Sequence, residues 1–168
     1  MSLSMYQASV PVFQRTLGAL DKILDKAAGY ASERKIDPAT LLGARLYPDM
    51  FPLTRQVQIA TDHAKGASAR LAGAPVPSFE DNEKTFAELK ARIGKTLDFI
   101  GTFKPAQIDG SEGRDISLKA GPRELTFKGQ DYLLFFALPN FYFHATTAFG
   151  ILRHNGVSIG KLDFLNAA

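Results

Sequence analysis

The sequence predicts an all-α protein: a four-helix bundle with a small β-hairpin in the long connection before the last helix. Apolar residues recur at three- and four-residue steps over four separate stretches, which is typical of amphipathic helices. Between the third and fourth stretches, two short segments alternate apolar and polar residues around a turn, which is typical of a hairpin. The length of 168 residues and the absence of an internal repeat predict that residues 1–168 form one domain.

The first two long helices are expected at about Met5 to Arg34 and about Leu53 to Leu71. The first carries the stripe Val10, Phe13, Leu17, Leu20, Leu24, Ala27 and Ala31. Between them, Asp37 followed by Pro38 predicts the start of a short helix, with a cap residue and then a proline at the first helical position. That helix must end before Pro48, because the residue preceding a proline avoids the α region.

The third long helix follows a linker, "AGAPVPSF", which is rich in glycine and proline. Ser78 and Asp81 resemble a capping box, with aspartate in place of the usual Glu or Gln. The helix should end near Phe103, ahead of Pro105. Its apolar stripe is Phe86, Leu89, Ile93, Leu97 and Ile100.

The hairpin is expected at residues 115–119 and 124–128, around the turn "AGPR". The last helix should run from about Gln130 to Asn155, and its first half is apolar nearly all round. This half should therefore be the most buried element. Pro139 cannot donate to the carbonyl of Phe135, and we expect it to kink the helix.

Composition excludes several function classes. The chain has no cysteine, which rules out thiolate chemistry and Cys-bound metals and suits a reducing compartment. No secretory signal and no long apolar run is present, so a cytoplasmic protein without a membrane association is expected. The pI is 9.2, but the net charge is only +3 and basic residues alternate with acids. This pattern argues against nucleic-acid binding, which needs clustered Lys and Arg.

Asn140 and His144 form the best candidate site, because residues four apart share one face of a helix. Bundle proteins build metal and ligand sites from side chains that project inward from facing helices. His144 is therefore a candidate ligand for a divalent metal such as zinc or nickel, with Asn140 a weaker partner. Alternatively, His144 is a buried histidine that is hydrogen-bonded by Asn140, by a tyrosine or by the backbone.

The other two histidines of the chain are also candidates. His63, beside Asp62, could complete a histidine pair with His144, but it lies near the edge of its helix stripe, where Gln56 and Gln58 compete as the inward polar group. His154 lies about 15 Å beyond His144 on one helix, so the two cannot share an ion and helix capping is its expected role.

Arg45 and Asp49 could clamp an anionic ligand at the mouth of the bundle, or form an ion pair that pins a loop. Tyr142 could supply a hydroxyl to a pocket or simply pack near the core. The sequence lacks G-x-S-x-G, P-loop, G-x-G-x-x-G and H-E-x-x-H patterns, and it lacks the E-x-x-H pairs of di-iron bundles. Serine hydrolase, nucleotide-binding and zincin functions are therefore not indicated.

Five long phrases of the chain resemble a known family. They are "SVPVFQRTLGALDKILDKA", "ARLYPDMFPLTRQVQIA", "ARLAGAPVPSFEDNEKTFAEL", "YLLFFALPNFYFHATTAFGILRHNGVSIGK" and "DFL". Together they are similar to a bacterial family of unknown function within the DinB/YfiT-like four-helix-bundle superfamily. The resemblance implies metal-dependent chemistry, in some members a thiol transfer, and it implies a homodimer.

The resemblance also implies a metal triad of one histidine on the second helix and an H-x-x-x-H on the fourth. Asn140 and His144 fall on the two positions of that motif, so this chain reads N-x-x-x-H. Gln58 falls nearest the ligand position of the second helix, and His63 lies more than one turn later. The resemblance therefore implies an altered metal site.

Three functions follow. The first is a bundle with a small-ligand pocket around Asn140, His144, Gln58, Arg45, Asp49 and Tyr142 and a degenerate metal site. The second is a divalent-metal enzyme, similar to the thiol transferases, that uses His63 and His144; its metal would lower the pKa of a bound water or thiol. The third, a nucleic-acid role, rests only on the mild positive charge and the damage-inducible name of the superfamily.

Overall fold

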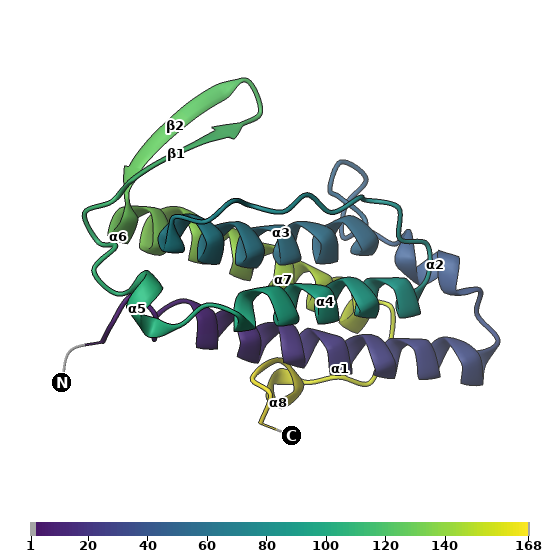
Figure 1. The fold of residues 1–168 in the computed structure, drawn as a ribbon. Coiled ribbons are helices and arrows are strands. Elements are labelled where there is room, and N and C mark those ends of the chain that lie inside the picture. Colours follow the sequence, from purple (N-terminus) through teal and green to yellow (C-terminus); the bar gives the residue numbers. More distant parts are fainter. Residues whose placement is uncertain (1–2, 168) are drawn as a thin grey trace.

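Four long helices form a bundle in this computed structural model, which describes residues 3–167 and only the backbone of Ala120. They are α1 (Val10–Arg34), α3 (Leu53–Ala72), α4 (Phe86–Gly101) and α7 (Leu138–His154). The helices run side by side in Figure 1, and α3 packs against both α4 and α7, as does α1. The predicted four-helix bundle is confirmed.

The apolar stripe predicted for the first helix is buried on α1, and the one predicted for the third is buried on α4 except for the partly exposed Leu97. On α3 the buried positions Ala60, Ala64 and Ala67 are small, so α7 can approach its axis closely. On α1 the stripe from Val10 to Ala31 is buried almost completely. Within residues 3–167, no helix has both the length and the apolar character that crossing a membrane requires.

The connection between α1 and α3 contains the short helix α2 (Pro38–Leu42). Asp37 caps it, because its carboxylate accepts a hydrogen bond from the Ala39 amide at 2.9 Å. The helix ends at Leu42, six residues before Pro48, which agrees with the prediction that it ends before that proline. An irregular loop then leads to α3.

The start of α4 differs from the prediction. The Thr85 hydroxyl accepts from the Glu88 amide at 3.1 Å, and the Glu88 carboxylate accepts from the Thr85 amide at 2.9 Å, which completes a capping box. The box predicted at Ser78 is therefore wrong. Residues 74–84, here called the strap, are extended and run along α3 in Figure 1, and Pro75 and Pro77 favour that extended backbone.

The predicted hairpin is confirmed. It follows the short helix α5 (Pro105–Ile108), and its strands β1 (Asp115–Ala120) and β2 (Arg123–Lys128) are antiparallel. Ile116 pairs with Phe127 and Leu118 with Leu125, so one face of the ribbon is apolar. In Figure 1 the hairpin projects from the end of the bundle next to α6.

The last helical run consists of α6 (Gly129–Asp131), the π-helix η1 (Tyr132–Ala137) and α7. The Leu138 amide donates to the carbonyl of Leu133, five residues back, so a wider turn precedes Pro139. Proline lacks an N–H, and a locally widened helix is one way to accommodate it. After α7, the short helix α8 (Lys161–Phe164) packs on α1 and is joined to it by the ion pair Lys26–Asp163.

Candidate functional site

His63 and His144 lie side by side between α3 and α7. Their ring centroids are 5.9 Å apart and the ring planes differ by 13°. The two helices run antiparallel here, because Gln56 of α3 contacts His144 while His63, further along α3, contacts Phe136 before α7. Both rings are partly exposed. The helix packing thus joins two histidines that stand far apart in the sequence.

Gln56 fixes the His144 ring. Its Nε2 donates to the carbonyl of Phe51 at 3.0 Å, so its Oε1 is the atom that faces Nδ1 of His144, at 2.7 Å. An amide oxygen can only accept, and His144 must therefore carry its proton on Nδ1 when the ring is neutral. This leaves Nε2 of His144 with a free lone pair, the arrangement in which imidazoles bind metals or accept hydrogen bonds.

Both histidines are held in the neutral form. Burial lowers the pKa of His63 to about 4, and the nearby His144 and Arg70 act in the same direction while Asp62 opposes them. Burial also lowers the pKa of His144, and the positive charge of Arg55 adds to the effect. At neutral pH the pair therefore presents lone pairs rather than charges.

Asn140 lies one turn before His144, but its side chain is turned to its own helix. Its Nδ2 donates to the carbonyl of Phe136 at 2.7 Å. Aromatic rings bound the pair on both sides: Phe136 lies 5.9 Å from His63 and Phe143 lies 5.2 Å from His144, measured between ring centroids. Each imidazole thus has an aromatic ring beside it.

Gln58 does not join the histidines. It is buried against the strap, where its Nε2 donates to Glu83 at 2.8 Å and its Oε1 accepts from Arg55 at 3.2 Å. Two residues apart on a helix point in directions about 200° apart, so Gln56 and Gln58 cannot both face α7. In the folded protein Gln56 faces α7, whereas the sequence alone did not distinguish between Gln56 and Gln58 for this position.

The other predicted site residues lie away from the pair. Arg45 donates to the carbonyl of Met50 at 2.7 Å and thereby pins its loop, while Asp49 is exposed. Tyr142 lies on the outer face of α7, where it lines a hollow with Leu46 and Phe143. His154 is the last residue of α7 and is exposed.

The donor set fits a tightly held divalent metal poorly. A catalytic zinc site uses three protein ligands and a structural one uses four. The described part of the chain, residues 3–167, contains no group of three or more His, Cys, Asp and Glu side chains that could hold an ion. His63 and His144 supply two good ligands, and Asn140, one turn before His144, has only a carboxamide oxygen, which is a weak ligand, to add to them.

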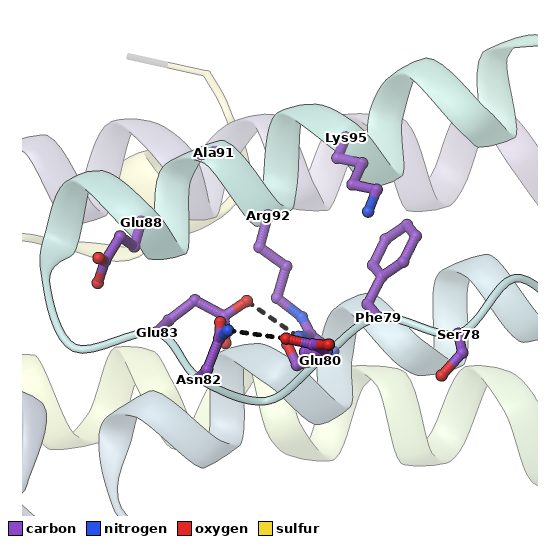
Figure 2. Close-up of a pocket in the computed structure, with 9 residues that line it drawn as sticks. All are labelled: Ser78, Phe79, Glu80, Asn82, Glu83, Glu88, Ala91, Arg92 and Lys95. Atoms are coloured by element: carbon purple, nitrogen blue, oxygen red, sulfur yellow. Dashed lines mark hydrogen bonds and ion pairs between the residues drawn. The ribbon is translucent and has the colours of Figure 1, made fainter.

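A second polar cluster, which was not predicted from the sequence, lies between α3, α4 and the strap. Arg92 of α4 is buried, and its side chain reaches down to the strap in Figure 2. Its guanidinium donates four hydrogen bonds of 2.7–3.0 Å, to Thr61 Oγ1, the Glu80 carbonyl, Asp62 and Glu83, and it forms an ion pair with Asp81 at 3.0 Å. The acidic run "FEDNEK" in the strap was its only sequence signal.

The Arg92 cluster is balanced in charge. Asp62 also pairs with Lys65 at 3.0 Å, and Asp81 also pairs with Arg55. Beside this cluster, the ammonium groups of Lys65 and Lys95 lie 3.9 and 4.1 Å from the centroid of the Phe79 ring. The cluster binds the strap to α3 and α4. A hollow of about 510 Å³ remains between the strap and α4, beside Phe79 and Lys95 (Figure 2).

The bundle with its projecting hairpin is similar in fold to a DinB family protein of known structure. A crystal structure of a DinB family member protein from Shewanella denitrificans is 41% identical, with a TM-score of 0.87, and the match covers 97% of this chain and 92% of that one. The family described as Domain of unknown function (DUF1993) matches residues 5–165, and the chain belongs to it. No functionally curated protein matches significantly.

Proposed function

We propose that this protein binds a small polar molecule at the His63–His144 pair, in a metal site that has become degenerate. The supporting observation is the hydrogen bond from His144 Nδ1 to Gln56 at 2.7 Å, next to a second neutral imidazole. It leaves Nε2 of His144 as a fixed acceptor. A ligand with an O–H, N–H or S–H group would donate to this acceptor.

The residues around the histidine pair further restrict the class of ligand that the site could bind. Phe136 and Phe143 offer apolar surface on either side of the imidazoles. Arg55 and Arg70 make the potential positive, because both lower the pKa of a neighbouring histidine. The proposed ligand is therefore a small alcohol, thiol or amide with an apolar portion, rather than a cation.

The second candidate is the divalent-metal enzyme. The observation that favours it is the approach of two neutral imidazoles to 5.9 Å, since metal ligands must be unprotonated. His63 and His144 would hold the ion, and the metal would supply a Lewis acid that lowers the pKa of a bound water or thiol.

Metal titration of tag-free protein separates the two candidates. Isothermal calorimetry with zinc and with nickel should detect no stoichiometric site in the wild type. The Asn140→His variant, which restores the H-x-x-x-H motif, should gain a site at one ion per chain. Adding His144→Ala to that variant should abolish it, while adding the control His154→Ala should leave it intact.

Stoichiometric metal in the wild type, lost in His144→Ala, would establish the enzyme candidate instead. The ligand itself is tested by NMR of the histidine ring nitrogens during titration with small alcohols, thiols and amides. Shifts of His144 Nε2 that are absent in Gln56→Met would support the proposed site. If no compound in the screen shifts the ring-nitrogen signals of His63 or His144, the proposed site would be contradicted.

We further propose that the protein is a cytoplasmic homodimer. The lack of cysteine suits a reducing compartment. The dimer is supported by the exposed aromatic residues Phe135 and Phe143 on the last helical run, which would otherwise remain in contact with water. Sedimentation equilibrium between about 1 and 100 µM tests the dimer, and a monomer throughout that range would contradict it.

A further inference from the structure

Arg70 is a partly buried arginine without an acidic partner. It lies in the last turn of α3, and its Nη1 donates at 3.1 Å to the hydroxyl of Tyr132. Within residues 3–167, no Asp or Glu oxygen lies within 4.0 Å of its guanidinium, whereas Arg55 and Arg92 both form ion pairs with the strap. A guanidinium has five N–H donors, so most of the donors of Arg70 are available to a ligand.

A glycine one turn before Arg70 makes room for the guanidinium. A Cβ at Gly66 would lie 2.5 Å from Nη1 of Arg70, and the three atoms nearest to that Cβ all belong to Arg70. The guanidinium therefore lies over Gly66, folded back along α3 toward the start of the helix. Glycine inside a helix is destabilising relative to alanine, and this close approach explains why a glycine stands here.

The folded-back guanidinium lies on the same side of α3 as the histidine pair. His63, Gly66 and Arg70 follow each other at three- and four-residue steps, so they share one face of the helix. Arg70 is close enough to His63 for its positive charge to lower the pKa of that imidazole. Asp62 has the opposite effect, but its carboxylate is already paired with Arg92.

The last helical run supplies the facing side. Phe136, Asn140 and His144 follow at four-residue steps, and all three are partly exposed. One turn earlier, Tyr132 holds the guanidinium of Arg70, and its ring stacks on that of Phe136 with centroids 5.9 Å apart. We call the line of side chains from His144 to Arg70 the α3–α7 seam. It has an acceptor, Nε2 of His144, toward one end and the donors of Arg70 at the other.

We infer that the ligand of the histidine pair carries a carboxylate, and that Arg70 is the residue that recognises it. The ligand class is a small carboxylic acid with a hydroxyl, thiol or amide N–H group, such as a hydroxy acid or an N-acyl amino acid. Its carboxylate accepts from Arg70, its donor group donates to Nε2 of His144, and its apolar part lies against Phe136. The inference rests on the proposed function and specifies the class of ligand.

A carboxylate suits this site better than other small anions. It is planar and carries one negative charge, so a single guanidinium can bind it through two parallel N–H···O bonds. The carbonyl end of α3, where Arg70 lies, is the negative end of the helix dipole and offsets part of the positive charge. A doubly charged phosphate is normally bound by several cations or by the opposite end of a helix.

Pairs of compounds that differ only in the carboxylate test the inference. The ring nitrogens of His63 and His144 are followed by NMR during titration with lactate or lactamide, and with N-acetylalanine or its amide. In the wild type, the acid of each pair should bind at least about 10-fold more tightly than the amide, because only the acid forms a charged pair with Arg70. In Arg70→Met the two should bind equally. The control Arg153→Met removes the same charge at an exposed residue of α7 and should keep the preference.

Gly66→Ala tests the position of the guanidinium without removing it. The new Cβ would displace the end of the Arg70 side chain, so the preference for the acid should fall several-fold. The thermal midpoint should not fall, because alanine is the better helix former. If Arg70 only braced Tyr132, Gly66→Ala and Arg70→Met would change stability and leave the ratio of acid to amide affinity as it is, which would overturn the inference.

The remaining outcomes separate this inference from the proposed function. If acids and amides shift the His144 signal with equal affinity in the wild type, the role of Arg70 is overturned and the proposed ligand site stands. If none of the compounds shifts either histidine, both are contradicted. Inorganic phosphate or sulfate that bound as tightly as the acids, and lost its affinity in Arg70→Met, would overturn the assignment of a carboxylate.

Discussion

The Nδ1 atom of His144 lies 2.7 Å from Oε1 of Gln56, and the same amide donates to the carbonyl of Phe51. This short chain of hydrogen bonds orients both the amide and the imidazole, because the carbonyl at its end can only accept. It connects the start of α3 to the middle of α7, and it determines which ring nitrogen of His144 faces outward.

Replacing Gln56 by Met should release the ring while keeping its volume. Nitrogen-15 NMR of the wild type should show neutral His144 with its proton on Nδ1, and Gln56→Met should give a mixture of tautomers. The free energy of unfolding should fall by about 1–3 kcal/mol, since two partners of a buried amide are lost. A wild-type ring protonated on Nε2 would contradict the assignment.

Stability should depend on pH through His63. Its pKa is about 4 in the folded protein and 6.5 when unperturbed, so between these values the unfolded chain binds a proton that the folded one does not. Stability is complete above pH 6.5 and falls as the pH drops toward 4, by at most about 3 kcal/mol before allowance for partial exposure. Urea unfolding at several pH values should show a smaller fall in His63→Gln. An identical pH profile for the two proteins would contradict the lowered pKa.

Arg92 should be among the most sensitive positions for stability. Arg92→Met removes the buried guanidinium that joins Asp62, Asp81 and Glu83, and because Asp62 and Asp81 are partly exposed and keep other partners, the cost should come mainly from the hydrogen bonds lost at Glu83, Thr61 and the Glu80 carbonyl, about 2–3 kcal/mol. Limited proteolysis should then cut the strap first. The control Lys95→Met, at an exposed residue beside Phe79, should cost less than about 1 kcal/mol. If the two substitutions lowered the stability equally, the Arg92 cluster would not be the main contact that holds the strap.

The first turn of α4 should depend on Thr85 rather than on Ser78. Thr85→Ala removes the hydroxyl that accepts from the Glu88 amide and should cost about 1 kcal/mol in thermal or urea unfolding. Ser78→Ala should leave stability unchanged within about 0.5 kcal/mol, since Ser78 lies exposed in the strap. A larger loss of stability in Ser78→Ala than in Thr85→Ala would instead indicate that the helix starts at Ser78.

Much of the fold could be predicted from local patterns. The stripe from Val10 to Ala31, the alternation around "AGPR" and the cap at Asp37 each depend on residues close together in the chain. Helix periodicity and turn chemistry act over a few residues, and they are therefore visible in sequence. The start of α4 was predicted wrongly because the sequence contains two capping patterns in succession, one at Ser78 and one at Thr85. Arg92 binds Asp81 and Glu83 of the strap, and these contacts are formed when the helix starts at the later pattern.

The sequence by itself determined the bundle, its hairpin, and the Asn140–His144 pair as the place to look for function. Only the tertiary structure decided that Gln56 rather than Gln58 faces His144, that His63 joins it, and that the strap is fixed by a buried arginine. The physical reason is that periodicity defines which side chains share a face, whereas the rotation of one helix against another defines what that face meets. If α3 were rotated about its axis, Gln58 instead of Gln56 would face His144. The apolar pattern of α3 does not define this rotation closely enough to choose between the two glutamines.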